Sequence, residues 1–223
     1  SQLLKKQIEL NRFEPVYFAK FLDKKINNTR EKKEGFAEEA FNLSTTSFIS
    51  HSRASIKIQD GCNSNCSYCA IHLARGKSVS LDVQTVLNRV LDLERNNNNE
   101  VVITTVNIAQ YKGEYNGKYF NFSQLLDFLL KNTTKISFRI SSLYPQIVND
   151  EFCRVISHER VRPHFHISVQ SGSDKILSLM NRNYVSEDVY LACKKIREVK
   201  KDAFIACDII TGFPGETKED FIK

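Results

Sequence analysis

Three cysteines lie within eight residues of one another, Cys62, Cys66 and Cys69, in the spacing C-x3-C-x2-C. Thiolates are soft ligands that suit zinc ions and iron–sulfur clusters. All three can reach one centre if the loop that carries them wraps around it. Three ligands on a four-iron cube leave one iron open, and an open coordination position is what a catalytic cluster needs. The spacing therefore favours a [4Fe-4S] cluster held by these cysteines.

A structural zinc site is the second interpretation, with His72 as the fourth ligand, because two residues separate Cys69 from His72. Structural zinc is usually held by two separated ligand pairs, which this stretch lacks. If these residues hold zinc, the chain would be an α/β binding module that the zinc ion stabilises, without redox chemistry. The remaining cysteines, Cys153, Cys193 and Cys207, are scattered, and we expect buried, unreactive thiols there.

Composition narrows the class of protein. Of the 223 residues, 41% are hydrophobic and 26% are charged, as in an ordinary globular protein. No apolar run reaches the ~20 residues that a membrane crossing requires, so we expect no membrane partner. No export signal opens the sequence, and six cysteines are too few for a disulfide scaffold, so we expect a cytoplasmic location. The net charge of +6 permits a nucleic-acid partner without requiring one.

Short β-branched or aromatic runs alternate with amphipathic stretches from about residue 51 onward. Repeated strand–helix units imply a parallel sheet with right-handed crossovers. The cysteines directly follow the first strand, and α/β folds place their active sites at the carboxyl ends of parallel strands. The five expected strands are Ala54–Gln59, Glu100–Val106, Lys135–Ile140, His164–Val169 and Ala203–Ile210.

Polar residues that precede apolar stripes predict where the helices begin. Alternation along the fourth strand places His164, His166 and Gln170 on one face. The same alternation leaves Phe165, Ile167 and Val169 to pack beneath the helices. The expected helix caps are Ser80, Ser123, Asn149, Ser173, Ser186 and Thr217.

The chain divides by composition into two parts. Residues 1–50 combine a short helical pattern with a charged stretch, and we interpret them as an N-terminal remnant and linker. Residues 51–223 form the core domain. Its fifth strand–helix unit breaks off within the first turns of a helix at Lys218–Lys223, so we expect this domain to be incomplete.

The sequence around the cysteines resembles the radical S-adenosylmethionine (SAM) superfamily, including the aromatic Tyr68 before the last cysteine. Further segments, in the usual order and at the usual separations, are similar to those of the methylthiotransferases. The resemblance covers roughly residues 51–221. The segments that carry it are 51–54, 57–62, 74–76, 105–108, 164–166, 170–174, 180–182 and 212–217.

This resemblance implies a partial (β/α) TIM-like barrel of the radical SAM type, truncated after the fifth strand. It implies a [4Fe-4S] cluster whose open iron chelates SAM, and transfer of a methylthio group. The most similar branch modifies C2 of N6-threonylcarbamoyladenosine at position 37 of tRNA. The implied partners are the tRNA anticodon loop and an electron donor such as flavodoxin or ferredoxin. The branches that act on isopentenyladenosine or on a ribosomal protein are the alternatives.

Five residues besides the cysteines are implied as cofactor-binding by the same resemblance. Tyr68 would lie near the adenine of SAM and Asn107 near its amino group. Gln170 and Ser171 end the fourth strand, where contacts to the ribose are expected. Arg182 would pair with the SAM carboxylate, because guanidinium groups bind carboxylates through two parallel hydrogen bonds.

Four residues depart from the family pattern: His72, Thr105, Tyr144 and Thr211. The family usually has Gly at Thr105, and a β-branched residue restricts how closely the backbone approaches a ligand. Family members also carry an RNA-binding C-terminal domain, and an N-terminal domain with three more cysteines and a second, sulfur-supplying cluster. Residues 1–61 contain no cysteine. We therefore expect this chain to bind one cluster and SAM without completing methylthiolation.

Overall fold

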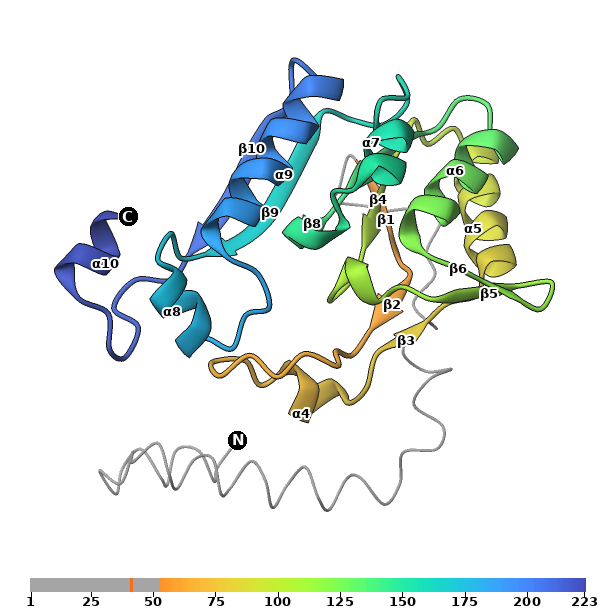
Figure 1. Cartoon of the computed structure of the whole chain (residues 1–223). Coiled ribbons are helices and arrows are strands. Elements are labelled where there is room, and N and C mark those ends of the chain that lie inside the picture. The colour runs from red at the N-terminus through yellow and green to blue at the C-terminus, as the bar shows by residue number, and fades with distance from the viewer. Residues whose placement is uncertain (1–40, 42–52) are drawn as a thin grey trace, which may run out of the picture. The chain divides into compact units, whose positions relative to one another are not determined.

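The computed structural model describes Phe41 and residues 53–223, so the predicted remnant and linker lie outside the described residues apart from Phe41. The strands of the core run parallel and follow one another in chain order (Figure 1). Only Ser141 separates the end of β7 from the start of β8. This short connection links the sheet β1-β4-β7 to the sheet β8-β9-β10. The strands are β1 (Ala54–Lys57), β4 (Glu100–Thr104), β7 (Ser137–Ile140), β8 (Ser142–Leu143), β9 (His164–Gln170) and β10 (Phe204–Ile209).

The spatial order of the strands distinguishes between the two common parallel architectures. Each crossover moves one position in the same direction, as in a (β/α) barrel, whereas a doubly wound sheet reverses its order near the middle. Ile56, Ile103 and Ile140 stand side by side in the register of the first three strands. All five predicted strands are present, and the predicted partial barrel is confirmed.

Helices cover one face of these strands (Figure 1). The strand residues beneath them, such as Val101, Ile103, Phe165 and Ile167, are fully buried, which confirms the predicted alternation. This apolar layer forms the core, and the polar residues between its members lie on the other face. The covering helices are α5 (Val83–Arg95), α6 (Phe122–Asn132), α7 (Asp150–Ile156) and α9 (Ser186–Val199).

Several predicted helix caps were wrong. Asp82, not Ser80, caps α5 by accepting a hydrogen bond from Thr85 N at 2.8 Å, because Ser80 is part of a strand. Asn121, not Ser123, caps α6. At α9 the cap position is held by Val185, and the helix begins at Ser186 itself. Asn149 caps α7 and Thr217 caps α10 (Lys218–Ile222), as predicted.

Ser173 precedes α8 (Asp174–Leu179), but its hydroxyl does not cap that helix. It donates instead to Asp220 Oδ1 at 2.8 Å, and Lys175 Nζ lies 2.7 Å from Asp220 Oδ2. Lys175 and Ser173 hold the pKa of Asp220 well below its usual range. This buried contact fastens α10 to the start of α8.

Shorter elements flank the cysteine loop and the second crossover. β2 (Gln59–Asp60) pairs antiparallel with β3 (Val79–Ser80), so the loop that carries the cysteines leaves and returns at one place. None of the helices in the described part of the chain is both long and apolar enough to cross a membrane. The other short elements are α4 (Ile71–Arg75), the hairpin β5 (Gly113–Tyr115) and β6 (Lys118–Phe120), and the 3-10 turns η2 (Ile108–Gln110) and η3 (Pro145–Ile147).

A substitution at Phe138 tests the core, because this side chain is fully buried on β7. We expect Phe138→Ala to lower the free energy of unfolding by about 3–5 kcal/mol, through lost burial and the cavity left behind. Tyr190→Ala on the exposed face of α9 is the control, and we expect it to change stability by less than about 0.5 kcal/mol. Denaturant unfolding measures both, and equal effects would contradict this description of the core.

Candidate functional site

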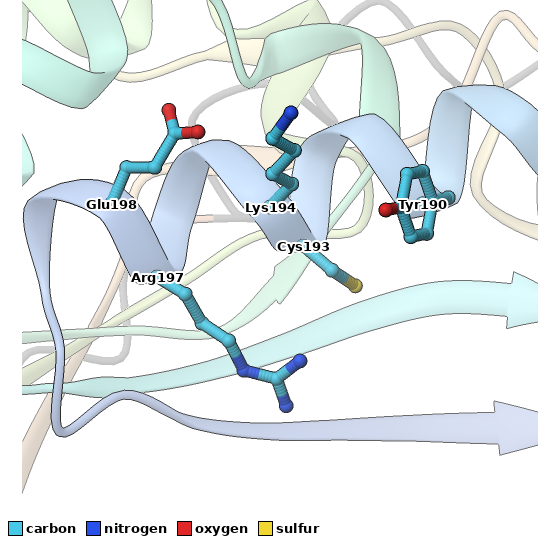
Figure 2. A pocket seen from close by; sticks show the side chains of 5 residues that line it. All are labelled: Tyr190, Cys193, Lys194, Arg197 and Glu198. Carbon is cyan, nitrogen blue, oxygen red and sulfur yellow. The ribbon is translucent and has the colours of Figure 1, made fainter.

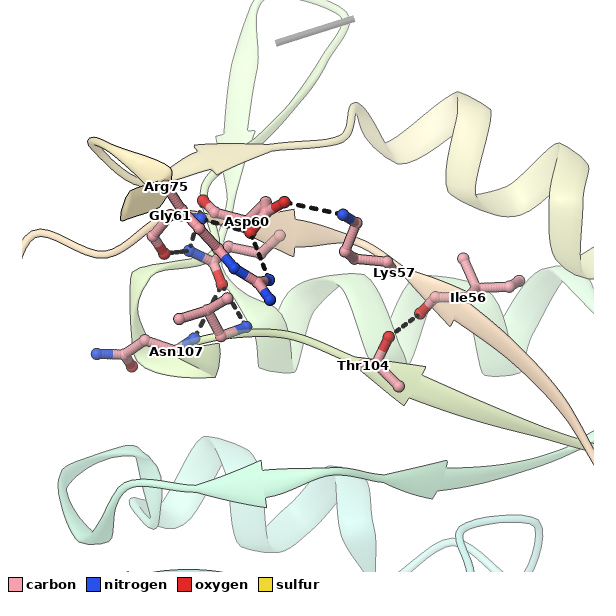
Figure 3. Close-up of polar contacts among 9 residues, drawn as sticks. Ile56, Lys57, Asp60, Gly61, Arg75, Thr104 and Asn107 are labelled. Carbon is pink, nitrogen blue, oxygen red and sulfur yellow. Dashed lines mark hydrogen bonds and ion pairs between the residues drawn. The ribbon is translucent and has the colours of Figure 1, made fainter. Parts of the chain in front are cut away.

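The cysteine loop begins at a glycine that no other residue could replace without strain. Gly61 has φ +69°, and a Cβ there would lie 2.1 Å from the carbonyl oxygen of Lys77. Its neighbour Asp60 binds Lys57 Nζ at 2.8 Å and Arg75 Nη1 at 3.0 Å (Figure 3). Burial raises the pKa of Asp60, but hydrogen bonds from Lys57, Gly61 and Arg75 outweigh burial and hold it below its usual value. These contacts fix where the loop starts.

The side chain of Gln59 joins the carboxyl ends of β1 and β4. It is fully buried, and its Oε1 accepts hydrogen bonds from the backbone N–H groups of Val106 and Asn107, both at 2.9 Å (Figure 3). Its Nε2 donates to Gly61 O at 2.8 Å. The strand that was predicted to run through Val106 ends at Thr104, because the backbone N–H groups of Val106 and Asn107 bond to Gln59 and not to a neighbouring strand.

Nitrogen donors surround the first cysteine. Cys62 Sγ lies 3.4 Å from Ser64 N, 3.9 Å from Asn107 Nδ2 and 3.8 Å from Gln110 Nε2. Gln110 Oε1 also accepts from Asn63 N at 2.8 Å. Gln110 was not among the predicted site residues, although its place three residues after Asn107, in the same turn, was a usable signal.

The turn that ends α8 holds the other side of the loop. Ser67 N donates to Met180 O at 3.1 Å, and Ser67 Oγ donates to Leu179 O at 2.9 Å. Asn181 Nδ2 donates to Asn65 O at 2.7 Å. The segment around Cys66 is therefore attached to a part of the chain more than a hundred residues away.

Arg182 follows that turn and is enclosed by three tyrosines. Its Nη1 donates to Tyr144 Oη at 2.8 Å and its Nη2 to Tyr68 Oη. The guanidinium carbon lies 5.1–5.5 Å from the ring centres of Tyr68, Tyr144 and Tyr184. Burial raises the pKa of the Cys66 thiol, and the positive charge of Arg182 opposes that rise. Burial likewise raises the pKa of Tyr68 to about 12.

The predicted cofactor residues fall into separate groups. Tyr68 and Arg182 are together beside Cys66, whereas Asn107 lies beneath Cys62 with its amide directed at the sulfur. Gln170 ends β9 with φ 68°, and the buried Ser171 accepts from Ser173 N at 3.1 Å. Within the described residues, no hydrogen bond joins Gln170 or Ser171 to the cysteine loop.

Within the described part of the chain, buried polar side-chain atoms without a hydrogen-bond partner lie mostly at the carboxyl ends of the strands and beside the cysteine loop; the exception is His164 Nδ1, at the start of β9. Thr105 directly follows β4 and Ser141 directly follows β7, and each has a buried hydroxyl without a hydrogen bond in the described structure. The same holds for His72 Nδ1 in α4 and Arg182 Nε. Since an unpaired buried polar atom is costly, this edge is suited to a polar ligand.

The polar face of the strands also carries a row of polar contacts. Ser142 Oγ lies 3.0 Å from His166 Nδ1, and Asp208 Oδ2 lies 3.2 Å from His166 Nε2. The row crosses β8, β9 and β10 on the face that the helices do not cover. This face of β8, β9 and β10 therefore presents polar groups.

The donor atoms of the three cysteines fit an iron–sulfur cluster, because such clusters are held by cysteine thiolates. Across Phe41 and residues 53–223, no three His, Cys, Asp or Glu side chains stand close enough to hold one metal ion. Cluster thiolates also accept hydrogen bonds, as Cys62 does here. The donor set thus fits a cluster.

The remaining cysteines lie away from this loop. Cys153 is buried as predicted and Cys193 is half-buried, but Cys207 is exposed, so that part of the prediction was wrong. The reason is that β10 pairs only with β9 in the described residues, which leaves Cys207 uncovered. Figure 2 shows Cys193 in a shallow surface hollow formed by α9 side chains alone, none of them a predicted site residue.

Solved structures with the same fold are radical SAM enzymes. The radical SAM methyltransferase TsrM from Kitasatospora setae, solved with tryptophan and a SAM analogue, matches with a TM-score of 0.60 and 17% identity, over 75% of this chain and 32% of that one. The cobalamin-dependent radical SAM enzyme OxsB matches with a TM-score of 0.53 and 17% identity, over 70% of this chain and 23% of that one. At this identity the likeness concerns the fold alone.

Curated relatives are more similar in sequence. A protein of Treponema pallidum named threonylcarbamoyladenosine tRNA methylthiotransferase MtaB is 50% identical over 84% of this chain and 38% of its own length. Its namesake in Rickettsia prowazekii is 39% identical over 79% of this chain and 42% of its own length. A tRNA-2-methylthio-N(6)-dimethylallyladenosine synthase of Endomicrobium trichonymphae is 37% identical over 74% of this chain and 39% of its own length. The chain thus spans about two fifths of the length of these relatives. The model of the radical SAM superfamily matches residues 56–223, and the chain belongs to that superfamily.

Proposed function

We propose that this chain is the catalytic core of a tRNA methylthiotransferase that modifies C2 of N6-threonylcarbamoyladenosine at position 37. In this proposal Cys62, Cys66 and Cys69 hold a [4Fe-4S] cluster, and SAM binds beside it at the carboxyl ends of the strands. The main support is the cysteine loop, which combines three thiols with N–H donors beside an edge of unpaired buried polar atoms. The cluster, when bound, supplies the electron that cleaves SAM and the open iron that holds it.

The residues around the cluster have positioning roles in this proposal. Asn107 and Gln110 donate to the Cys62 sulfur, which stabilises the thiolate and fixes its direction. Tyr68 belongs to the loop itself and its ring is partly exposed, so it can cover the adenine of SAM. Gln170 and Ser171 are proposed to contact the ribose. The apolar layer between strands and helices excludes water from one side of the site.

The relatives support one substrate over the alternatives. Four proteins named threonylcarbamoyladenosine tRNA methylthiotransferase are 37–50% identical to this chain. Four named tRNA-2-methylthio-N(6)-dimethylallyladenosine synthase are 33–37% identical. The first substrate is therefore preferred, and the isopentenyladenosine and ribosomal-protein branches are the alternatives. A cytoplasmic location, an anticodon-loop contact, and electron transfer from flavodoxin or ferredoxin belong to the same proposal.

Cysteine variants test the cluster against the zinc module. We expect the chain, reconstituted without oxygen with iron and sulfide, to turn brown, bind about four irons, and bleach with dithionite. Cys66→Ala should lose the colour, since two thiols hold a cube poorly. The exposed Cys207→Ala is the control and should keep it. A colourless chain that binds one zinc through Cys62, Cys66, Cys69 and His72 would support the binding module instead.

Two neighbouring threonines test the SAM site. Thr105 Oγ1 has no partner in the described structure, whereas Thr104 Oγ1 donates to Ile56 O at 3.2 Å (Figure 3). If SAM bonds to Thr105, Thr105→Val should weaken SAM binding about tenfold without lowering stability, because the protein loses no bond of its own. Thr104→Val should lower stability by about 1 kcal/mol and leave SAM affinity unchanged. Calorimetric titration and denaturant unfolding separate the two, and identical behaviour would contradict this placement.

Nucleoside mass spectrometry of tRNA tests the substrate. A strain that lacks the full-length gene should lose 2-methylthio-threonylcarbamoyladenosine and regain it when that gene is restored. This 223-residue chain alone should not restore it, because no cysteine precedes Cys62 to hold the second, sulfur-supplying cluster. Methylthiolated tRNA formed by the chain alone would contradict that expectation, and loss of a different modified nucleoside would favour another branch.

A further inference from the structure

The side chain of Gln110 reaches three consecutive residues at the start of the cysteine loop. Its Oε1 accepts a hydrogen bond from Asn63 N at 2.8 Å. Its Nε2 lies 3.1 Å from Ser64 Oγ and 3.8 Å from Cys62 Sγ. Both ends of the amide are therefore bonded to the loop, the oxygen to its backbone and the nitrogen to its side chains.

The turn that carries Gln110 is anchored before and after that residue. Before it, Asn107 N donates to Oε1 of the fully buried Gln59 at 2.9 Å, and Asn107 Oδ1 accepts from Ala109 N at 3.1 Å. After it, Tyr111 is almost fully buried, and its hydroxyl donates to a backbone carbonyl oxygen at 2.9 Å. The Gln110 side chain therefore extends from a fixed point of the fold to the cysteine loop.

The direction of the Gln110 amide follows from its partners. A backbone N–H can only donate, so the amide atom beside Asn63 N must be the oxygen. The nitrogen then faces Cys62, because the two amide atoms lie on opposite sides of the same planar group. The reversed amide would place two donors against each other at Asn63, which would lose that hydrogen bond. The bond to the loop backbone thus keeps an N–H donor directed at the sulfur.

We propose that Gln110 is a positioning residue that raises the reduction potential of the cluster, by donating from Nε2 to the sulfur of Cys62. The inference rests on the proposed function, because it requires that the loop hold a cluster. Reduction transfers one electron from an external one-electron donor and adds a negative charge to the cluster and its thiolates. Hydrogen bonds to cluster sulfurs stabilise the more negative state and so raise the potential.

The test is a potentiometric titration of the reconstituted chain without SAM, followed by electron paramagnetic resonance. Gln110→Met has a similar length but neither donates nor accepts. We expect the ratio of reduced to oxidised cluster at a fixed applied potential to fall about threefold, as for part of one net hydrogen bond. Gln110→Glu keeps an oxygen for Asn63 N but turns a negative oxygen toward Cys62, so the ratio should fall further, about tenfold.

The matched control is Gln84→Met, the same substitution on the exposed face of α5. Gln84 Nε2 donates to Asn88 Oδ1 at 2.9 Å, one turn along the same helix. This variant should keep the wild-type potential, which shows that the effect at Gln110 depends on its place beside the loop. Iron per chain is measured in every sample, so that potentials are compared only between loaded chains.

The outcomes separate a tuned potential from a simple tie in the loop. If Gln110 only ties the loop, Gln110→Glu keeps that tie and should keep the wild-type potential, which would overturn the inference. Unchanged potentials in both variants would also overturn it. Loss of loading in both would do the same, because the amide would then act on cluster assembly. A wild-type chain that binds no cluster would contradict the proposed function itself, and the inference with it.

Discussion

The site depends on the fixed shape of a short loop that has little secondary structure of its own. Two distant parts of the chain supply that shape. Gln59, buried and bonded to the backbone of Asn107, ties the start of the loop to the end of β4. The turn after α8 bonds to Asn65 and Ser67 on the other side. The first attachment lies at the carboxyl ends of β1 and β4, and the second lies at the end of α8, the helix that follows β9, so the partial barrel positions the cysteines.

The electrostatics of the loop follow from the same attachments. Burial of Cys66 disfavours its thiolate, so the charged form needs donors and a cation nearby. Ser64, Asn107 and Gln110 supply the donors at Cys62, and Arg182 supplies the cation at Cys66.

Features that depend on residues close together in the sequence were predicted correctly. The five strands and the buried alternation of Phe165 and Ile167 follow from sequence periodicity and are confirmed. The ends of elements were predicted less well, because Ser80 and Ser173 are drawn into other contacts. The enclosure of Arg182 could not be predicted, since Tyr144 is 38 residues away in sequence and Tyr68 is 114 away. Tyr144 was noted only as a departure from the family pattern.

The central claim is that three sulfurs of this loop hold a cluster with one iron open to SAM. The most direct measurement is the electron paramagnetic resonance spectrum of the anaerobically reconstituted, dithionite-reduced chain before and after SAM is added. The account predicts the spectrum of a reduced [4Fe-4S] cluster whose shape changes on addition of SAM, because SAM binds to the open iron. A cluster spectrum that SAM leaves unchanged, or a chain that binds zinc and no iron, would contradict it.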